Sequence, residues 1–163
     1  LILHTLVYPL LMAIYAAYGS NLDPVRMAKL APHSPIIGPG WLSGWRLTFG
    51  RVENGWDETL PTIVEDVTSQ VFVMLYELTE QDEDALNSAE GFNFDFYRKV
   101  HVRVNTLNGQ FTAWLYVVNG YESGLPRQSV VDAIIESAIV AGAPNDYVAM
   151  ISNFVTVEDD SDE

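Results

Sequence analysis

Hydrophobic and polar residues alternate most regularly between residues 96 and 104. The valines occupy the even positions from 100 to 104, and basic residues and His101 occupy the odd positions from 99 to 103. Successive side chains of a strand lie on opposite faces, so this pattern predicts a strand with one buried face. Asn108-Gly109 predicts a tight hairpin turn, and the apolar residues 111–118 return as the partner strand. An antiparallel hairpin is therefore expected here.

Further strands are predicted from apolar segments on either side of this region. These segments are residues 12–17, 45–50, 62–67 and 71–78. The segment 71–78 is almost continuously apolar, which is typical of a strand buried on both faces. With the hairpin, about six strands are expected. Polar stretches and stretches rich in Gly and Pro are predicted to be loops. The predicted loops are residues 31–40, 53–60 and 120–126.

Helices are predicted where capping residues precede a periodic apolar pattern. The expected helices are residues 23–30, 79–90, 128–141 and 146–154. Asp23 can cap the first of them, with Pro24 at the first helical position, and Thr79 can cap the second. Gly91 is expected to end the second helix, and Gly142-Ala143-Pro144 separates the last two.

The order of these elements favours an α/β (α+β) fold. Clustered strands and a hairpin favour a small mixed, mainly antiparallel sheet that closes toward a barrel, with flanking helices outside it. The 163 residues are enough for one domain with its own core. We expect this domain at residues 12–155, between an N-terminal extension at 1–11 and an acidic disordered tail at 156–163.

Charge and composition narrow the classes of partner. The formal net charge of −14 opposes binding to nucleic acid or to an anionic membrane. Cysteine is absent and the three histidines are scattered, so no spacing typical of a metal site occurs. His33, in a predicted loop, is expected to be solvated. Residues 1–11 are too short to span a membrane and lack the basic start of a signal peptide. We expect a cytoplasmic protein.

A small polar turn joins the first predicted strand to the first helix. It consists of Tyr18, Gly19, Ser20, Asn21 and Leu22. Gly19 permits backbone conformations that are closed to other residues. Unpaired N–H groups at a helix start can face a carboxylate or a phosphate. The turn is therefore either an anion-binding loop or an ordinary connection between a strand and a helix.

Glu90 is the acidic residue with the most unusual surroundings. It is expected at a helix C-terminus, where the helix dipole opposes a negative charge, and aromatic residues follow it at positions 92, 94, 96 and 97. Both the dipole and desolvation by the rings raise the pKa of a carboxyl group toward the range useful for general acid–base catalysis. The alternative is an exposed Glu with no special role.

The turn at 18–22 and the segment Ala89-Glu90-Gly91 are two motifs in a characteristic order. Further motifs are residues 44–50, 73–78 and 97–100, and the final helix pair broken at 142–144. Together they resemble the gamma-glutamylcyclotransferase-like family, also called avirulence-induced-gene-2-like. The resemblance covers about residues 13–152.

This resemblance implies a small barrel-like fold with one cavity. It also implies that N–H groups of the loop at 18–22 bind the α-carboxylate of a gamma-glutamyl group. Glu90 then transfers protons while the substrate's α-amine attacks its own γ-carbonyl. The products would be 5-oxoproline and a free amino acid or amine, and the reaction would belong with the cyclising transferases or lyases of glutathione metabolism. No cofactor or metal is implied. The expected partner is a small gamma-glutamyl molecule, with no nucleic acid or membrane, and a homodimer is left open.

One position departs from the family pattern. After Gly-Leu-Pro at 124–126, family members often have Ser and, three residues later, a Tyr that lines the cavity. Here those positions are Arg127 and Val130. The missing phenol points either to a drier pocket with another leaving amine or to lost activity. Several aromatic residues have two interpretations, lining the cavity or packing in the core: Tyr76, Tyr97, Tyr116, Trp41 and Trp56.

Three classes of function remain for comparison. The first is a cyclotransferase, and the second is a binding module that keeps the same cavity without turnover. The third is an interaction protein that uses its acidic surface or residues 1–11 to pair with another chain.

Overall fold

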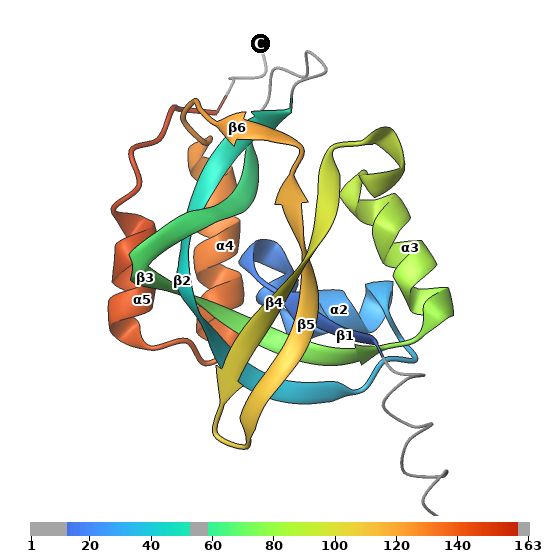
Figure 1. Cartoon of the computed structure of the whole chain (residues 1–163). Coiled ribbons are helices and arrows are strands. Elements are labelled where there is room, and N and C mark those ends of the chain that lie inside the picture. Colours follow the sequence, from blue (N-terminus) through green and yellow to red (C-terminus); the bar gives the residue numbers. More distant parts are fainter. Residues whose placement is uncertain (1–12, 53–58, 160–163) are drawn as a thin grey trace, which may run out of the picture.

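The strands form a closed sheet in the computed structural model, which describes residues 13–52 and 59–159 (Figure 1). Its strands are β1 (Ala13–Ala17), β2 (Ile36–Val52), β3 (Leu60–Leu78), β4 (Tyr97–Thr106), β5 (Gly109–Val118) and β6 (Gly120–Glu122). Five of them follow the order β3-β1-β5-β4-β2, and β2 pairs again with β3, which closes a barrel. β6 pairs with the C-terminal end of β2.

Most neighbouring strands in this barrel run antiparallel. β1 with β3, β2 with β3, β2 with β4 and β4 with β5 are antiparallel pairs, whereas β1 and β5 are parallel. Helices pack against the outside of the sheet. The predicted fold class, a mixed, mainly antiparallel and barrel-like α/β (α+β) fold with flanking helices, is confirmed.

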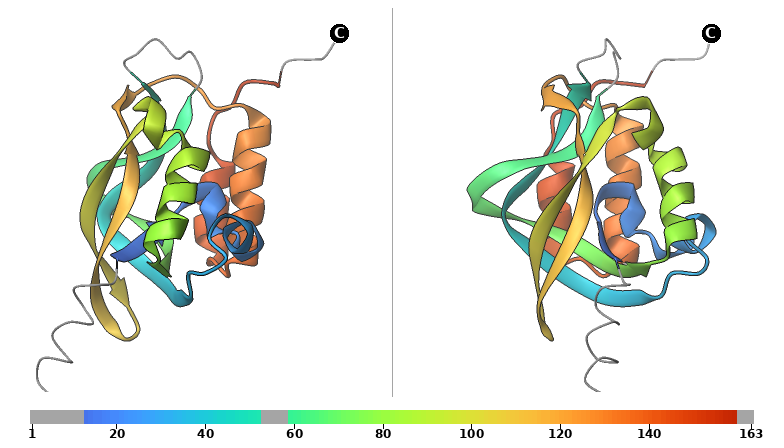
Figure 2. Two further views of the ribbon diagram at one scale, coloured as in Figure 1. Left: turned by 90° about the vertical axis from the view of Figure 1, so that its right-hand side faces the viewer. Right: turned by 45° about the vertical axis from the view of Figure 1, so that its right-hand side comes forward.

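The helices cover part of the barrel wall. They are α2 (Pro24–Leu30), α3 (Glu80–Glu90), α4 (Gln128–Val140) and α5 (Asn145–Ser152), with short 3-10 helices η1 (Gly19–Leu22) and η2 (Phe92–Phe94). In Figure 1, α3 lies to the right of the barrel, α5 lies at its left edge and α4 lies behind β2 and β3. The left panel of Figure 2 shows the β4–β5 hairpin on one side and α2, α3 and α4 on the other.

Alternation along the strands produces two apolar layers. Leu75 and Leu115 belong to a cluster made of strand residues, which we assign to the barrel interior. Their sequence neighbours Met74 and Trp114 belong to a second cluster, together with residues of the helices such as Ile134. Because successive side chains point to opposite faces, this second layer lies between the barrel wall and the helices. The candidate site described below is built in this outer layer.

The hairpin and the helix caps follow the sequence pattern. β4 and β5 pair in register from Tyr97 with Val118 to Thr106 with Gly109. Asp23 accepts a hydrogen bond from the backbone N–H of Val25 at 2.9 Å, as expected of a capping residue. The predictions of a hairpin and of a capped first helix are therefore confirmed.

The start of β2 corrects a prediction. Residues 31–40 were predicted to be a loop, but β2 begins at Ile36 and continues through Pro39 and Gly40. A Cβ atom at residue 40 would lie 2.5 Å from Cγ1 of Val104, so the strand crossing here requires glycine. A register shift between Ile36 and Gly38 accommodates the irregular backbone. Gly and Pro are typical of loops, but in a sheet they also occur at bulges and where two strands approach closely, as they do here.

Two other boundaries differ from the predicted ones. The segments 62–67 and 71–78 belong to one strand, β3. Gln70 pairs with Ser43 and Glu65 pairs with Trp45, and the strand continues through an irregularity at residues 66–69. The predicted loop at 120–126 was wrong for its first three residues, which form β6 against β2. Most of the predicted loop at 53–60, with Trp56, and the proposed extension at 1–11 lie outside the described residues.

The first residues of the acidic tail are held in place. The N–H of Val157 donates to the carbonyl of Pro126 at 2.9 Å, and the N–H of Gln128 donates to the carbonyl of Val157 at 3.0 Å. Ser129 Oγ donates to a carboxylate oxygen of Asp159 at 2.7 Å. The prediction of a frayed tail was therefore wrong for residues 156–159, because free backbone groups at the start of α4 pair with them.

Candidate active site

A pocket of about 480 Å³ opens between the barrel wall and the elements outside it. Loop 18–22, the ends of α2 and α3, η2 and α4 all contribute to its wall. The lining residues are Tyr15, Tyr18, Ser20, Asn21, Arg26, Leu60, Pro61, Ser88, Ala89, Glu90, Gly91, Phe94, Phe96, Tyr97, Tyr116 and Val130. The structure thus brings together most of the loop and the glutamate that the sequence singled out separately.

Loop 18–22 leaves the end of β1 and forms the 3-10 helix η1. Gly19 adopts a positive φ of 65°, a conformation that glycine reaches without strain. Leu22 is fully buried in the outer apolar cluster and anchors the loop. Ser137 of α4 donates a hydrogen bond to the carbonyl of Ser20 at 3.2 Å, which ties the loop to that helix. The hydroxyl of Tyr18 donates to the carbonyl of Tyr116 on the barrel wall.

Not every residue of the loop contributes a side chain to the pocket. Tyr18, Ser20 and Asn21 line it, whereas Leu22 points into the core and Gly19 has no side chain to offer. The N–H groups in the first turn of a 3-10 helix have no acceptor within that helix. These N–H groups belong to the part of the loop that lines the pocket.

The side chain of Asn21 connects the loop to Glu90, which is 69 residues away along the chain. Its amide nitrogen donates to Oε1 of Glu90 at 2.6 Å and to the hydroxyl of Tyr15 at 2.9 Å. Its amide oxygen accepts a hydrogen bond from Nε of Arg26 at 2.9 Å. Asn21 therefore presents a hydrogen-bond donor, and not an acceptor, to the Glu90 carboxyl.

Glu90 is the last residue of α3, and Gly91 ends the helix in the left-handed conformation with φ of 78°. A Cβ atom at residue 91 would lie 2.5 Å from Cδ2 of Phe96, so glycine is required next to Glu90. Burial raises the pKa of the Glu90 carboxyl above its ordinary value of 4.5. The hydrogen bond from Asn21 and the charge of Arg26 act in the opposite direction. The carboxyl therefore belongs to a partly buried acid with one directed donor.

Four phenols surround this carboxyl. Burial is the largest cause of a raised pKa in each of them, and the charge of Glu90 contributes as well. They are Tyr15, Tyr18, Tyr97 and Tyr116. A tyrosine is already neutral at physiological pH, and these raised pKa values move ionisation further away, so the four residues form polar, uncharged walls.

The structure decides which of the three tyrosines line the pocket and which one packs only in the core. The hydroxyl of Tyr116 donates to Asn87 at 2.7 Å, the hydroxyl of Tyr97 donates to the carbonyl of Pro61 at 3.1 Å, and both residues are buried and line the pocket. Tyr76 is buried in the outer apolar cluster and does not belong to the pocket lining. Sequence reasoning missed Tyr15 and Arg26. The register of β1 against β5 carries Tyr15 to this site, and no local motif indicates that.

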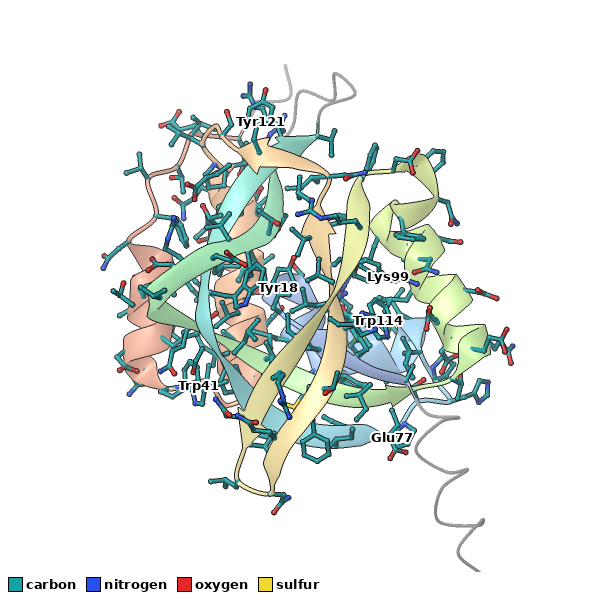
Figure 3. The ribbon with its side chains drawn as sticks, viewed as in Figure 1. Tyr18, Trp41, Glu77, Lys99, Trp114 and Tyr121 are labelled. Carbon is teal, nitrogen blue, oxygen red and sulfur yellow. The ribbon has the colours of Figure 1, made fainter. Side chains whose placement is uncertain are left out.

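Other candidates lie away from the pocket. Trp41 packs edge to face against Phe72 and Tyr147, with ring centroids 5.3 and 5.5 Å away, which is a packing role. Figure 3 shows Trp41 well separated from Tyr18. His33 is exposed, as predicted, and its backbone N–H donates to Asp82 at 2.8 Å. Val130, in contrast, lines the pocket.

Neither a metal-binding cluster nor a membrane-spanning helix is present in the described part of the chain. Among residues 13–52 and 59–159, no group of three or more His, Cys, Asp or Glu side chains is arranged to hold a metal ion. No helix within these ranges is long and apolar enough to cross a membrane.

Comparisons with known proteins agree on one family. The sequence model of the AIG2-like family matches residues 70–151, about half of the chain. Gamma-glutamylcyclotransferase of Mus musculus is 25% identical over 139 residues, which cover 82% of this chain and 74% of that protein. The Homo sapiens protein of the same name is 26% identical, with the same coverage.

Solved structures show the same fold. A structure of gamma-glutamyl cyclotransferase matches with a TM-score of 0.78 and 23% identity, over 90% of this chain and 89% of that chain. A structure of an uncharacterized protein from Homo sapiens matches with a TM-score of 0.80 and 23% identity, over 93% of each chain. At this level of identity, these structural matches establish the fold that the sequence predicted.

Proposed function

The chain belongs to the AIG2-like family, and from this premise we propose that it is an enzyme of the gamma-glutamylcyclotransferase type. Its substrate would be a small molecule with a gamma-glutamyl group. The observation that carries the proposal is the pair formed by Glu90 and Asn21. A partly buried carboxyl of raised pKa lies in the same pocket as a loop suited to binding an anion.

The reaction needs no nucleophile from the protein. The substrate's own α-amine attacks its γ-carbonyl, a bond forms between that nitrogen and carbon, and the amide bond to the leaving amine breaks. The products are 5-oxoproline and a free amino acid or amine. The protein must fold the gamma-glutamyl chain into a ring-like conformation, which is mainly a problem of orientation.

Glu90 is suited to the two proton transfers. Its ionised carboxylate accepts a proton from the substrate's ammonium group, and the protonated carboxyl then donates a proton to the leaving amine. A carboxyl with a raised pKa performs both steps better than an ordinary one, because its pKa lies closer to the working pH. Donors of the loop at 18–22 would hold the substrate's α-carboxylate and the developing oxyanion.

We expect purified protein to release 5-oxoproline from at least one compound in a panel of gamma-glutamyl amino acids, gamma-glutamyl amines and glutathione. Chromatographic quantification of 5-oxoproline measures this directly, and the panel identifies the leaving group. Absence of release from every compound would contradict the enzymatic proposal.

Val130, where the family resemblance implies a tyrosine, favours the second candidate, a binding protein that retains the cavity. That candidate predicts a higher Tm with a gamma-glutamyl ligand but no 5-oxoproline.

The pH dependence of kcat/KM provides a separate prediction. Only the ionised form of Glu90 can accept the substrate's proton, so activity is expected to fall on the acidic side as Glu90 becomes protonated. Because burial raises the pKa of Glu90, the midpoint of this fall is expected above 4.5, the ordinary value. A profile measured under conditions where circular dichroism shows an intact fold tests this. A midpoint at or below 4.5 would contradict the assignment of Glu90.

A further inference from the structure

The Asn21 side chain sits between a cation, a carboxyl group and a phenol. Nε of Arg26 is 2.9 Å from the amide oxygen, and the amide nitrogen is 2.6 Å from Oε1 of Glu90 and 2.9 Å from the Tyr15 hydroxyl. Asn21 is buried, with 5% of its surface exposed. Arg26 is the one cationic side chain among the described residues that line the pocket.

An asparagine amide is nearly symmetric in shape, so its neighbours decide which end points where. A guanidinium group has only donors and keeps its charge in proteins. Arg26 can therefore face only the oxygen of Asn21, which turns the NH₂ group toward Glu90. In this orientation Asn21 can donate to the carboxyl but cannot accept from it.

We propose that Arg26 is a positioning residue for Glu90 and acts through the Asn21 amide, which it locks in the orientation that donates to the carboxylate. The structural part of this proposal stands on the hydrogen bonds alone. Its consequence for turnover rests on the proposed function. A directed donor stabilises the ionised carboxylate and holds one of its oxygens in place, which is what a proton acceptor needs.

Without Arg26, the Asn21 amide is free to rotate by half a turn. Its oxygen could then accept a hydrogen bond from a protonated Glu90, so the protonated form would gain a partner that it lacks in the wild type. Removing the guanidinium also removes a favourable charge. Both changes favour the protonated form and raise the pKa of Glu90.

The other groups around Glu90 do not provide this control. Tyrosines of β1, β4 and β5 and Tyr18 of the loop are neutral at physiological pH, since the ordinary pKa of a tyrosine is about 10 and burial raises the pKa of these four further. On the inner side of α3, Glu83 forms an ion pair with Lys99 of β4 at 2.7 Å. Arg26 and Asn21 are the two groups that lower the pKa of Glu90.

Carbon-13 NMR titration of the Glu90 carboxyl tests the proposal without a substrate, with the resonance assigned through Glu90→Gln. In Arg26→Met, the midpoint of the Glu90 titration is expected to rise by roughly one pH unit, a tenfold change in proton affinity. Arg26→Lys keeps a charged donor and is expected to restore much of the wild-type value. Lys29→Met is the matched control, because it removes the same charge from an exposed position of α2. Equal titration midpoints in Arg26→Met and Lys29→Met would overturn the proposal.

Activity provides a second readout that separates the two proposals. In an active enzyme, the acidic limb of the kcat/KM profile is expected to move by the same amount in Arg26→Met as the NMR midpoint. A limb that stays in place while the NMR midpoint moves would overturn the consequence for turnover. If wild-type protein releases no 5-oxoproline, the proposed function fails, whereas the NMR titration still decides whether Arg26 orients Asn21.

Discussion

Glu90→Gln is expected to reduce kcat for 5-oxoproline release roughly 10³-fold, the middle of the range for general acid–base catalysis. Glutamine keeps the length of the side chain, and its amide oxygen can still accept the hydrogen bond that Asn21 now makes at 2.6 Å. It cannot take up or release a proton at any pH in the physiological range. The substitution therefore removes proton transfer and little else. Single-turnover and steady-state assays of 5-oxoproline measure the effect.

Glu80→Gln is a matched control for this experiment. Glu80 is exposed at the other end of the same helix, far along α3 from the pocket. The control makes the same chemical change and is expected to keep wild-type activity. Unchanged turnover in Glu90→Gln would rule out the proposed role of Glu90.

The stability of Glu90→Gln shows whether the loss is chemical or structural. Because burial raises the pKa of Glu90 above 4.5, the folded state binds a proton more tightly than the unfolded chain. The stability that the protonated form contributes is present below pH 4.5 and is lost as the pH rises through the raised pKa. Glutamine is neutral and avoids this loss. At neutral pH, urea unfolding is therefore expected to show a free energy of unfolding for the variant equal to or above that of the wild type.

The parts of the fold that sequence predicted well depend on local signals. Asn108-Gly109 between two alternating segments predicted the hairpin, and Thr79 and Gly91 predicted both ends of α3. Glu90 was singled out because its helix end and its aromatic neighbours are close in sequence. In each case the residues that decide the structure lie within a few positions of one another, where spacing alone carries the information.

The parts that could not be predicted depend on contacts between distant segments. Gly40 looked like a loop residue because only its approach to Val104 shows why glycine is needed in a strand there. Tyr15 reaches the pocket through the pairing of β1 with β3 and β5, and nothing near it in sequence indicates chemistry. The sequence around Arg26 is that of an ordinary helix, and its role depends on the contact of Asn21 with both Arg26 and Glu90. Strand pairing decides the positions of Gly40 and Tyr15, and the contact between loop 18–22 and the end of α3 gives Arg26 its role.

Trp114→Ala is expected to lower the free energy of unfolding by about 4 kcal/mol, within the range for removing a large aromatic side chain from a core. Trp114 is 6% exposed, and its ring centroid lies 4.9 Å from that of Tyr15 and 5.0 Å from that of Tyr116. Nζ of Lys99 lies 4.6 Å from the centroid of the Trp114 ring. Figure 3 shows the labelled Trp114 and Lys99 near each other beside α3. Truncation leaves a cavity beneath two tyrosines of the pocket wall and removes a cation–π contact. For a chain of this size, Tm is expected to fall by roughly 12 °C.

Trp114→Phe is the matched variant, because phenylalanine keeps an aromatic ring against both tyrosines and leaves a smaller cavity. This substitution is expected to lower the free energy of unfolding by only about 1 kcal/mol. Urea unfolding followed by far-ultraviolet circular dichroism measures both variants and does not depend on the lost tryptophan fluorescence. A loss of less than about 1 kcal/mol in the free energy of unfolding of Trp114→Ala would contradict this packing role.

Trp114→Ala and Glu90→Gln are expected to affect different properties of the protein. Trp114→Ala acts first on stability and reaches activity through Tyr15 and Tyr116, whereas Glu90→Gln acts on turnover in a protein that remains folded. The pocket thus combines an apolar layer that supports it with a partly buried carboxyl whose ionisation lowers the stability of the fold at neutral pH.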